Sequence, residues 1–234
     1  MRDTTAVILA GGLGTRLEDA VPGVPKVLAP VGGRPFVTYV LDAVAKAGLS
    51  KAVLCTGFRG DDVERALGAR YAGLDLVYSR EDSALDTAGA VRHALPLILT
   101  QTALVANGDS FCEADLEKMW SAHRERRASA TLLLTARAER GAFGSIDIEP
   151  GGRILRFQEK VEGQAQFISA GVYLLEREVI EGLAPDRRAS FEREVFPALV
   201  GAGTLFGFPG GGRFIDIGTR RTYEEAEAFF AALG

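Results

Sequence analysis

The sequence has little cysteine, little histidine and no long apolar run. Its 2 cysteines, Cys55 and Cys112, form no Cys-x-x-Cys pair, which excludes a disulfide framework and a zinc cluster and favours a reducing, cytoplasmic setting. The 2 histidines, His93 and His123, are too few for a histidine-rich metal site or a paired-histidine mechanism. The first apolar run, residues 6–10, is far shorter than a membrane span.

An excess of basic charge is also missing. Lys and Arg number 27 and Asp and Glu number 31, so the net charge is −4. Proteins that bind nucleic acid usually carry a basic stripe that contacts phosphates, and we therefore expect no nucleic acid partner. Asp3 and the short apolar stretch behind it argue against a secretory signal peptide, and we expect no membrane partner.

Glycine, by contrast, is abundant, and its position is informative. It makes up 28 of 234 residues, about 12% against an average of about 7%. Most glycines lie where turns and helix ends are predicted. Gly11, Gly12 and Gly14 differ because they directly follow an apolar strand pattern, where glycine lets backbone N–H groups approach an anion closely.

Apolar runs of strand length alternate with segments of helical periodicity in the first half of the chain. Strands are predicted over 5–10, 51–56, 74–78, 103–106 and 130–135, and helices over 36–47, 61–67, 87–95 and 113–125. This alternation predicts an α/β fold with a mostly parallel sheet and helices on both faces. No low-complexity linker interrupts the 234 residues, so we expect a single domain, 1–234.

The second half is less regular and richer in strands. Strands are predicted over 145–148 and 154–158 as a hairpin, and over 170–175, 204–208 and 213–217, the last two flanking a Pro-Gly-Gly-Gly turn. Thr222-x-x-Glu225 resembles a capping box and predicts the start of the last helix. We expect this half to form a smaller β-rich lobe against the α/β unit.

Three polar clusters stand at predicted strand ends, over residues 11–16, 107–110 and 216–219. Ligands of open α/β sheets bind beyond the carboxyl ends of the strands, so these clusters are expected to meet at one edge. Asp109 and Asp216 suit Mg²⁺, which usually takes one or two carboxylates together with phosphates and water. A helix cap or a turn residue is the alternative for each aspartate.

Two cations stand near the glycine-rich turn. Arg16 ends the turn with a planar charge that suits phosphate oxygens. Lys26 lies between Pro25 and Pro30, which would hold it in place as a point charge, although a solvated lysine is the simpler interpretation of that segment alone. The turn is not a dinucleotide fingerprint, because Leu17 replaces the third glycine, and it lacks the Gly-Lys-Ser/Thr of a P-loop.

Several segments carry a joint pattern in one order along nearly the whole chain. The most specific is residues 9–17, Leu-Ala-Gly-Gly-Leu-Gly-Thr-Arg-Leu. The others are Pro25-Lys26, Ala29-Pro30-Val31, Gly33-Arg34-Pro35, Leu85-Asp86-Thr87-Ala88-Gly89, Asn107-Gly108-Asp109, Glu159-Lys160, Ser169-Ala170-Gly171-Val172-Tyr173 and Ile215-Asp216-Ile217-Gly218-Thr219. Together they resemble the signature of the sugar-1-phosphate nucleotidylyltransferases.

The resemblance implies an enzyme that joins a sugar 1-phosphate to a nucleoside triphosphate and releases pyrophosphate, on a Rossmann-like, GT-A-like fold. It implies a nucleotide-binding half over about 1–135 and a sugar-phosphate-binding half over about 136–234. The nucleotide-binding residues would be Leu9, Ala10, Gly11, Gly12, Gly14, Thr15, Glu81, Asp86, Thr87, Gly89, Asn107 and Gly108. The sugar phosphate would bind Gly144, Glu159, Lys160, Ser169 and Gly171.

The resemblance also implies catalytic roles. Arg16 would neutralise the departing pyrophosphate, Lys26 would bridge phosphates near the reacting phosphorus, and Asp109, also counted as catalytic, would hold Mg²⁺ with Asp216. A phosphate oxygen with a second pKa of about 6 is largely ionised at pH 7, so the nucleophile needs no general base. A catalytically silent nucleotide-binding regulator would be expected to lack one of these residues, and all are present.

Residues 190–197, Ser-Phe-Glu-Arg-Glu-Val-Phe-Pro, look most like the D-glycero-α-D-manno-heptose 1-phosphate guanylyltransferases, and the chain has no room after Asp216 for the β-helix domain of longer relatives. This implies GTP, a heptose 1-phosphate and nucleotide-sugar supply for surface polysaccharide. Uridylyltransferases for N-acetylmuramate 1-phosphate or another hexose 1-phosphate, and mannose-1-phosphate guanylyltransferases, stay open. Homo-oligomer formation is left open as well.

The sequence departs from the family pattern at two positions. Asp86 stands where relatives usually have glycine, and Ser169 stands where many have asparagine. Glu81 or Asp86 is predicted to accept hydrogen bonds from the N1–H and 2-amino group of guanine, because a carboxylate matches these two donors. A cap on the following helix is the alternative for Asp86.

Overall fold

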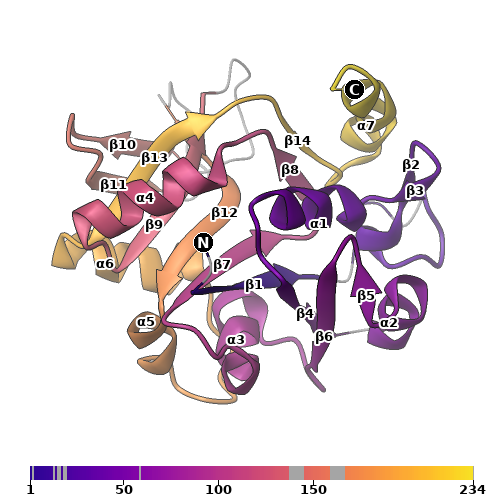
Figure 1. The fold of residues 1–234 in the computed structure, drawn as a ribbon, viewed down its shortest axis with the longest axis horizontal. Helices are drawn as coiled ribbons and strands as arrows, with labels where there is room; N and C mark the ends of the chain where they lie inside the picture. The colour runs from indigo at the N-terminus through magenta and orange to yellow at the C-terminus, as the bar shows by residue number, and fades with distance from the viewer. Residues whose placement is uncertain are drawn as a thin grey trace.

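The computed structural model describes residues 1, 3–12, 14, 17, 20–57, 59–136, 145–158 and 167–233. An eight-stranded sheet runs through it in the order β13-β9-β12-β7-β1-β4-β6-β5 (Figure 1). Its strands are β1 (Thr4–Leu9), β4 (Lys51–Thr56), β5 (Arg70–Tyr71), β6 (Leu74–Arg80), β7 (Thr102–Asn107), β9 (Ala130–Thr135), β12 (Ile168–Glu176) and β13 (Leu205–Gly211).

The sheet is mostly parallel, as the strand and helix alternation predicts. Strand β1 pairs in parallel with β4 and β7, β4 with β6, and β13 with β9, whereas β12 runs antiparallel to both of its neighbours. Strands β12 and β13 come from the second half of the chain and share the sheet with strands of the first half.

Side chains of the central strands alternate between two apolar layers. Ala6 and Ile8 of β1 face one layer, and Val7 faces the other. The first layer is covered by α1 (Val37–Lys46), α2 (Gly60–Leu67), α4 (Leu116–Arg126) and α7 (Arg220–Ala231). The second is covered by α3 (Asp86–His93), α5 (Arg177–Glu181) and α6 (Phe196–Ala202). The expectation of helices on both faces is confirmed.

Three small two-stranded sheets and three short turns of helix complete the described fold. The sheets pair β2 (Pro30–Val31) with β3 (Arg34–Pro35), β8 (Ser110–Cys112) with β14 (Phe214–Asp216), and β10 (Ser145–Ile148) with β11 (Ile154–Gln158), the last being the predicted hairpin. The turns are η1 (Lys26–Leu28), η2 (Leu95–Leu97) and the π-helical η3 (Phe191–Val195). No helix in the described part of the chain is long and apolar enough to span a membrane.

Two helix starts differ from prediction by three residues because side-chain caps fall elsewhere. The last helix begins at Arg220, with Thr219 as its cap: Thr219 Oγ1 accepts from the Thr222 amide at 3.2 Å, and Thr222 Oγ1 accepts from the Thr219 amide at 3.2 Å. The predicted box therefore lies three residues too late. Helix α4 begins at Leu116 rather than 113, because the Asp115 carboxylate accepts from the Lys118 amide at 3.0 Å.

The predicted strands on either side of the Pro-Gly-Gly-Gly segment separate in space. Strand β13 continues to Gly211 inside the large sheet, whereas β14 leaves it and pairs with β8 (Figure 1). This change of partner brings the end of β14 to the segment that follows β7. The local sequence predicts the turn but not the strand with which β14 pairs, since strand pairing depends on residues far apart in sequence.

Candidate active site at the carboxyl edge of the sheet

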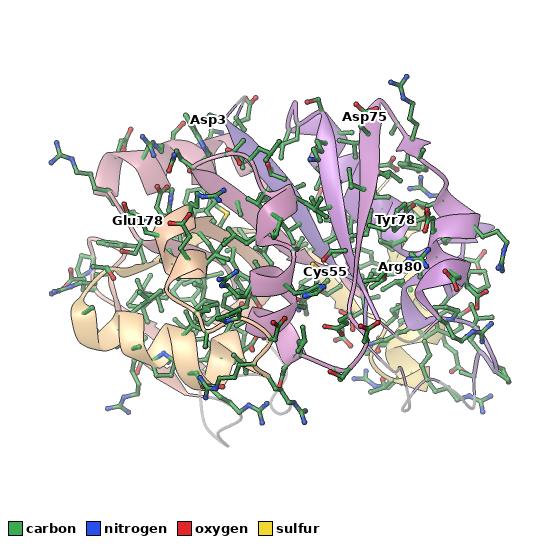
Figure 2. All side chains as sticks on the ribbon, turned by 90° about the horizontal axis from the view of Figure 1, so that it is seen from below. Asp3, Cys55, Asp75, Tyr78, Arg80 and Glu178 are labelled. Atoms are coloured by element: carbon green, nitrogen blue, oxygen red, sulfur yellow. The ribbon has the colours of Figure 1, made fainter. Side chains whose placement is uncertain are left out.

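The polar clusters at strand ends meet at one edge. Figure 2 labels Asp3 and Asp75 at the amino ends of β1 and β6, on the side opposite to Cys55 and Arg80 at the carboxyl ends of β4 and β6. At the carboxyl edge the Gly108 amide donates to the Leu9 carbonyl at 2.9 Å.

The third cluster joins the same edge through β14. The Ile217 amide donates to the Asp109 carbonyl at 3.0 Å. The predicted convergence is therefore confirmed for the described members of all three clusters.

A cavity of about 430 Å³ opens at this edge. The predicted residues that line it are Leu9, Gly11, Gly12, Gly14, Lys26, Glu81, Asp86, Thr87, Asn107 and Asp109. Gly218, from the predicted cluster over 216–219, lines it as well, and so do Cys55 and Arg188, to which the sequence assigns no role. Thr15, Arg16, Gly144, Glu159 and Lys160 lie outside the described residues.

Lys26 and Asp109 form an ion pair in the wall of this cavity. The Lys26 Nζ lies 2.5 Å from Asp109 Oδ2, with the lysine side chain 12% exposed and the carboxylate 35% exposed. Lys26 opens the η1 turn directly after Pro25, and its Cβ lies 3.0 Å from where a Cβ on Gly14 would be, so the lysine adjoins the glycine-rich turn. A partly exposed pair of this kind offers a positive and a negative group to a phosphate and its counter-ion.

The pairing of β14 with β8 places Asp216 opposite Ser110, and Gly218, two residues further along the chain, lines the cavity. The Asp216 Oδ1 accepts from the Gly218 amide at 2.7 Å, and the Lys26 Nζ lies 3.6 Å from where a Cβ on Gly218 would be. The Asp216 carboxylate therefore stabilises the turn that follows it and also lies close to the Lys26–Asp109 pair.

These donors fit Mg²⁺. Asp109 and Asp216 offer the hard oxygen ligands that this ion prefers. No cluster of three His, Cys, Asp or Glu side chains occurs among the described residues, so the ion would need oxygens from substrate phosphates and water as well.

Glu81 also lines the cavity, beside the glycine-rich turn. Its Oε1 would lie 2.9 Å from a Cβ on Gly11, so the glycine leaves the space that the carboxylate occupies. Its Oε2 accepts from the Leu85 amide at 3.3 Å. Burial raises the pKa of Glu81, the Leu85 hydrogen bond and the charge of His93 oppose this, and the charge of Asp86 adds to it.

The carboxylate of Asp86 is occupied by protein groups. Its Oδ1 accepts from the Thr87 amide at 2.9 Å, and its Oδ2 accepts from Arg193 Nη2 at 2.5 Å, with Arg188 Nε at 3.7 Å. Asp86 has a φ of +63°, a left-handed conformation that glycine adopts freely and aspartate tolerates. The residue that replaces glycine thus ties the turn over 85–89 to the segment over 187–193.

Thr87 and Gly89, which follow Asp86, also contact the segment over 187–193. The Thr87 hydroxyl accepts from the Phe191 amide at 3.0 Å and donates to Glu192 at 3.1 Å, so its hydrogen bonds are made within the protein. A Cβ on Gly89 would lie 2.6 Å from the Arg187 carbonyl oxygen. Close packing against the chain therefore accounts for Gly89, whose position lies behind the cavity wall.

On the side of β12, Gly171 brings the backbone against Asn107. Its φ is +73°, and a Cβ there would lie 2.7 Å from Asn107 Nδ2, so only glycine fits. The Gly171 amide donates to Ser169 Oγ at 3.3 Å, so this N–H is used within the protein. The two predicted sugar-phosphate residues that the structure describes thus lie on the strand beside the cavity.

A second, larger cavity, of about 900 Å³, lies between α1, β8 and α7. Its described lining includes none of the predicted site residues. The smaller cavity is the better candidate because it alone gathers the Lys26–Asp109 pair, Glu81 and the glycine-rich turn.

A family model described as nucleotidyl transferase matches residues 5–232. The chain belongs to the nucleotidyl transferase family. The family resemblance drawn from the motifs is therefore confirmed.

Two curated relatives are similar to this chain over most of its length. It is 32% identical over 222 residues to D-glycero-alpha-D-manno-heptose 1-phosphate guanylyltransferase of Aneurinibacillus thermoaerophilus, covering 95% of this chain and 96% of that one. It is 35% identical over 227 residues to mannose-1-phosphate guanylyltransferase of Mycobacterium tuberculosis, with 95% of this chain covered. The alignment spans 63% of the mycobacterial protein's length.

The fold of this nucleotidyl transferase has close counterparts among solved structures. The crystal structure of HddC from Yersinia pseudotuberculosis complexed with GMP-PN has a TM-score of 0.84 at 27% identity, covering 97% of this chain and 99% of that one. A putative glucose-1-phosphate thymidylyltransferase from Bacillus anthracis has a TM-score of 0.87 at 24% identity, covering 97% and 94%, and supports the Rossmann-like fold.

Proposed function

We propose that this chain transfers a nucleotidyl group from a nucleoside triphosphate to a sugar 1-phosphate and releases pyrophosphate. The observation that carries the proposal is the Lys26–Asp109 pair beside Asp216, in one cavity with Glu81 and the glycine-rich turn. GTP and D-glycero-α-D-manno-heptose 1-phosphate are the proposed substrates, since a heptose 1-phosphate guanylyltransferase is among the relatives matched over 96% of their length.

The residues of the chain meet the demands of this reaction by electrostatics. A sugar phosphate oxygen is already ionised near pH 7 and attacks the α-phosphorus, so no side chain has to remove a proton. The difficulty is to bring two polyanions together, which Lys26 eases by placing its charge beside the phosphates, while Arg16 neutralises the departing pyrophosphate. Mg²⁺ held by Asp109 and Asp216 would supply further neutralisation at the α-phosphate when bound.

Glu81 is the proposed reader of guanine. Its side chain lines the cavity, and its carboxylate, which accepts one bond from the Leu85 amide, has lone pairs left to accept from both N1–H and the 2-amino group, whereas uracil offers one N–H on its pairing edge. Asp86, the other candidate from the sequence, already accepts from Arg193 and from the Thr87 amide. The carboxylate of Glu81 therefore favours GTP over UTP, and the uridylyl alternatives are the less favoured ones.

A mannose 1-phosphate substrate is the second candidate, supported by the 35% identity to the mycobacterial guanylyltransferase. Either product would be a nucleotide-sugar made from cytoplasmic substrates, and the heptose version would supply surface polysaccharide.

A pyrophosphate-release panel tests the proposal. Five nucleoside triphosphates are combined with heptose, mannose, glucose and N-acetylmuramate 1-phosphates, each with and without Mg²⁺. We expect the fastest release from GTP with the heptose 1-phosphate and Mg²⁺. No release from any pair contradicts the transferase proposal, a preference for UTP contradicts the guanylyl part, and a preference for mannose 1-phosphate selects the second candidate.

A further inference from the structure

The segment over 187–193 is bonded closely to the turn over 85–89, although about a hundred residues separate them. The Ala189 carbonyl accepts from the amides of Ala88 and Gly89 at 2.9 and 3.1 Å, and the Ala189 amide donates to the Leu85 carbonyl at 2.9 Å. These bonds fasten the segment to the part of the chain that carries one wall of the cavity.

Glu192 lies at the centre of this contact and accepts from three hydroxyl groups. Ser190 Oγ donates to Glu192 Oε2 at 2.8 Å, Thr87 Oγ1 donates to the same oxygen at 3.1 Å, and the Tyr173 hydroxyl donates to Oε1 at 3.2 Å. Glu192 belongs to the π-helical η3 turn, a form that often occurs at functional sites. One carboxylate thus joins three separate stretches of chain.

Tyr173 extends the connection to the sugar-phosphate side. It lies on β12 and is 2% exposed. Burial raises the pKa of Tyr173 well above its ordinary value, the charge of Glu192 adds to this, and a side-chain hydrogen bond with Ser169 opposes it. The polar contacts therefore run from Thr87, in the cavity wall, through Glu192 to Tyr173 on β12, the strand that also carries Ser169.

We propose that Glu192 is a positioning residue that sets the spacing between the turn over 85–89 and strand β12, and so aligns the two substrates for in-line attack. The inference rests on the proposed function, since Thr87 lines the nucleotide cavity and Ser169 lies on the proposed sugar-phosphate strand. Partly buried hydrogen-bond networks of this kind are rigid when every member is satisfied. A misplacement of about 1 Å can lower a reaction rate by roughly a hundredfold.

Glu192→Gln removes the negative charge and changes one acceptor oxygen to a donor while keeping the shape of the side chain. We expect kcat to fall about 10- to 100-fold, with the KM for GTP changed less than about threefold, because an alignment acts in the transition state rather than on uniform binding. The kcat and the KM of the wild type and of the variant are measured well below the melting temperature of the variant, so that loss of folded protein does not contribute.

Glu176→Gln is the matched control. Glu176 also lies on β12 and also accepts from a hydroxyl, that of Thr102 at 2.9 Å, and it contacts His123 Nε2 at 3.0 Å, but at the far end of the strand. We expect this variant to lower the melting temperature and to keep kcat within about twofold of the wild type, since it is remote from the cavity.

Tyr173→Phe tests the proposal through the other side of the connection and serves if Glu192→Gln fails to fold. It should lower kcat in the same way, and the double variant should be no slower than the worse single one, since both break one network. A wild-type kcat in either folded single variant overturns the positioning role and leaves the transferase function standing. A wild type that releases no pyrophosphate with any pair overturns the function, and the positioning role with it.

Discussion

The two ends of the central sheet hold similar polar groups in different settings. At the amino end, His123 Nδ1 lies 2.8 Å from Thr131 Oγ1 and its Nε2 lies 3.0 Å from Glu176, which also accepts from Thr102. At the carboxyl end, Lys26, Asp109 and Glu81 line a cavity of about 430 Å³.

The difference teaches that neither residue type nor burial alone marks an active site. His123 is 1% exposed, and desolvation lowers its pKa. These two properties alone would suggest a catalytic histidine. Both ring nitrogens of His123 contact other protein groups, Thr131 and Glu176. The groups at the carboxyl end instead line a cavity that a substrate can enter.

The largest expected effect comes from the two proposed Mg²⁺ ligands. Asp109→Asn and Asp216→Asn, made separately, should each reduce Mg²⁺-dependent turnover by roughly a thousandfold or more, because charge neutralisation of the transferring phosphoryl group is the main catalytic term. Pyrophosphate release measures the rate, and circular dichroism checks the fold. Full activity in either variant removes that aspartate from the metal site.

A lysine at each end of the sheet gives the next test. Lys26→Met should lower kcat/KM by about 10²- to 10³-fold, since it removes a charge at the phosphates. Lys51→Met, at the start of β4, removes an Nζ that donates to the Leu97 carbonyl at 3.0 Å and should leave kcat/KM within about twofold. Equal losses in the two variants would mean that the cavity end has no special electrostatic role.

Glu81→Gln should weaken base selection by about tenfold, in line with the loss of a hydrogen bond between a charged group and guanine. The wild type should prefer GTP to ITP, which lacks the 2-amino group, and the variant should not. Competition assays with the two nucleotides measure the ratio. A wild type that takes ITP as readily as GTP is incompatible with this role.

The pH dependence of the same group has a defined sign. Because the pKa of Glu81 is raised, GTP affinity should fall, as pH decreases, at a higher pH than for an ordinary glutamate. The charged form is disfavoured in the fold, so Glu81 costs stability above its folded-state pKa, and this cost disappears as pH falls below it. Glu81→Gln should therefore raise the melting temperature of the free protein at pH 7 and remove this part of the pH dependence.

The smallest effect on base choice is expected for Asp86. Asp86→Gly relieves a left-handed aspartate but loses the Arg193 ion pair, so the two changes oppose each other in stability. The ratio of GTP to UTP turnover should stay within about twofold. A larger fall in that ratio would return Asp86 to the base-reading role that the sequence left open.

Much of the candidate site could be predicted because its signals are local. The glycine-rich turn follows directly on β1, Asn107 ends β7, and Lys26 follows Pro25, so each position is set by its neighbours in sequence. The order of strands and helices then places these ends on one edge. The position of Arg188 in the cavity lining could not be predicted, because the sequence of an arginine-rich loop does not show which of its arginines borders a cavity.

Local sequence sets the alternation of apolar runs, the layers on both faces of the sheet and the glycines at strand ends. Tertiary structure alone decided the partners: β14 with β8, Arg193 with Asp86 across 107 positions, and Glu192 with Thr87 across 105. The physical reason is range. Strand periodicity and turns depend on adjacent residues, whereas an ion pair or a shared hydroxyl depends on where the folded chain returns.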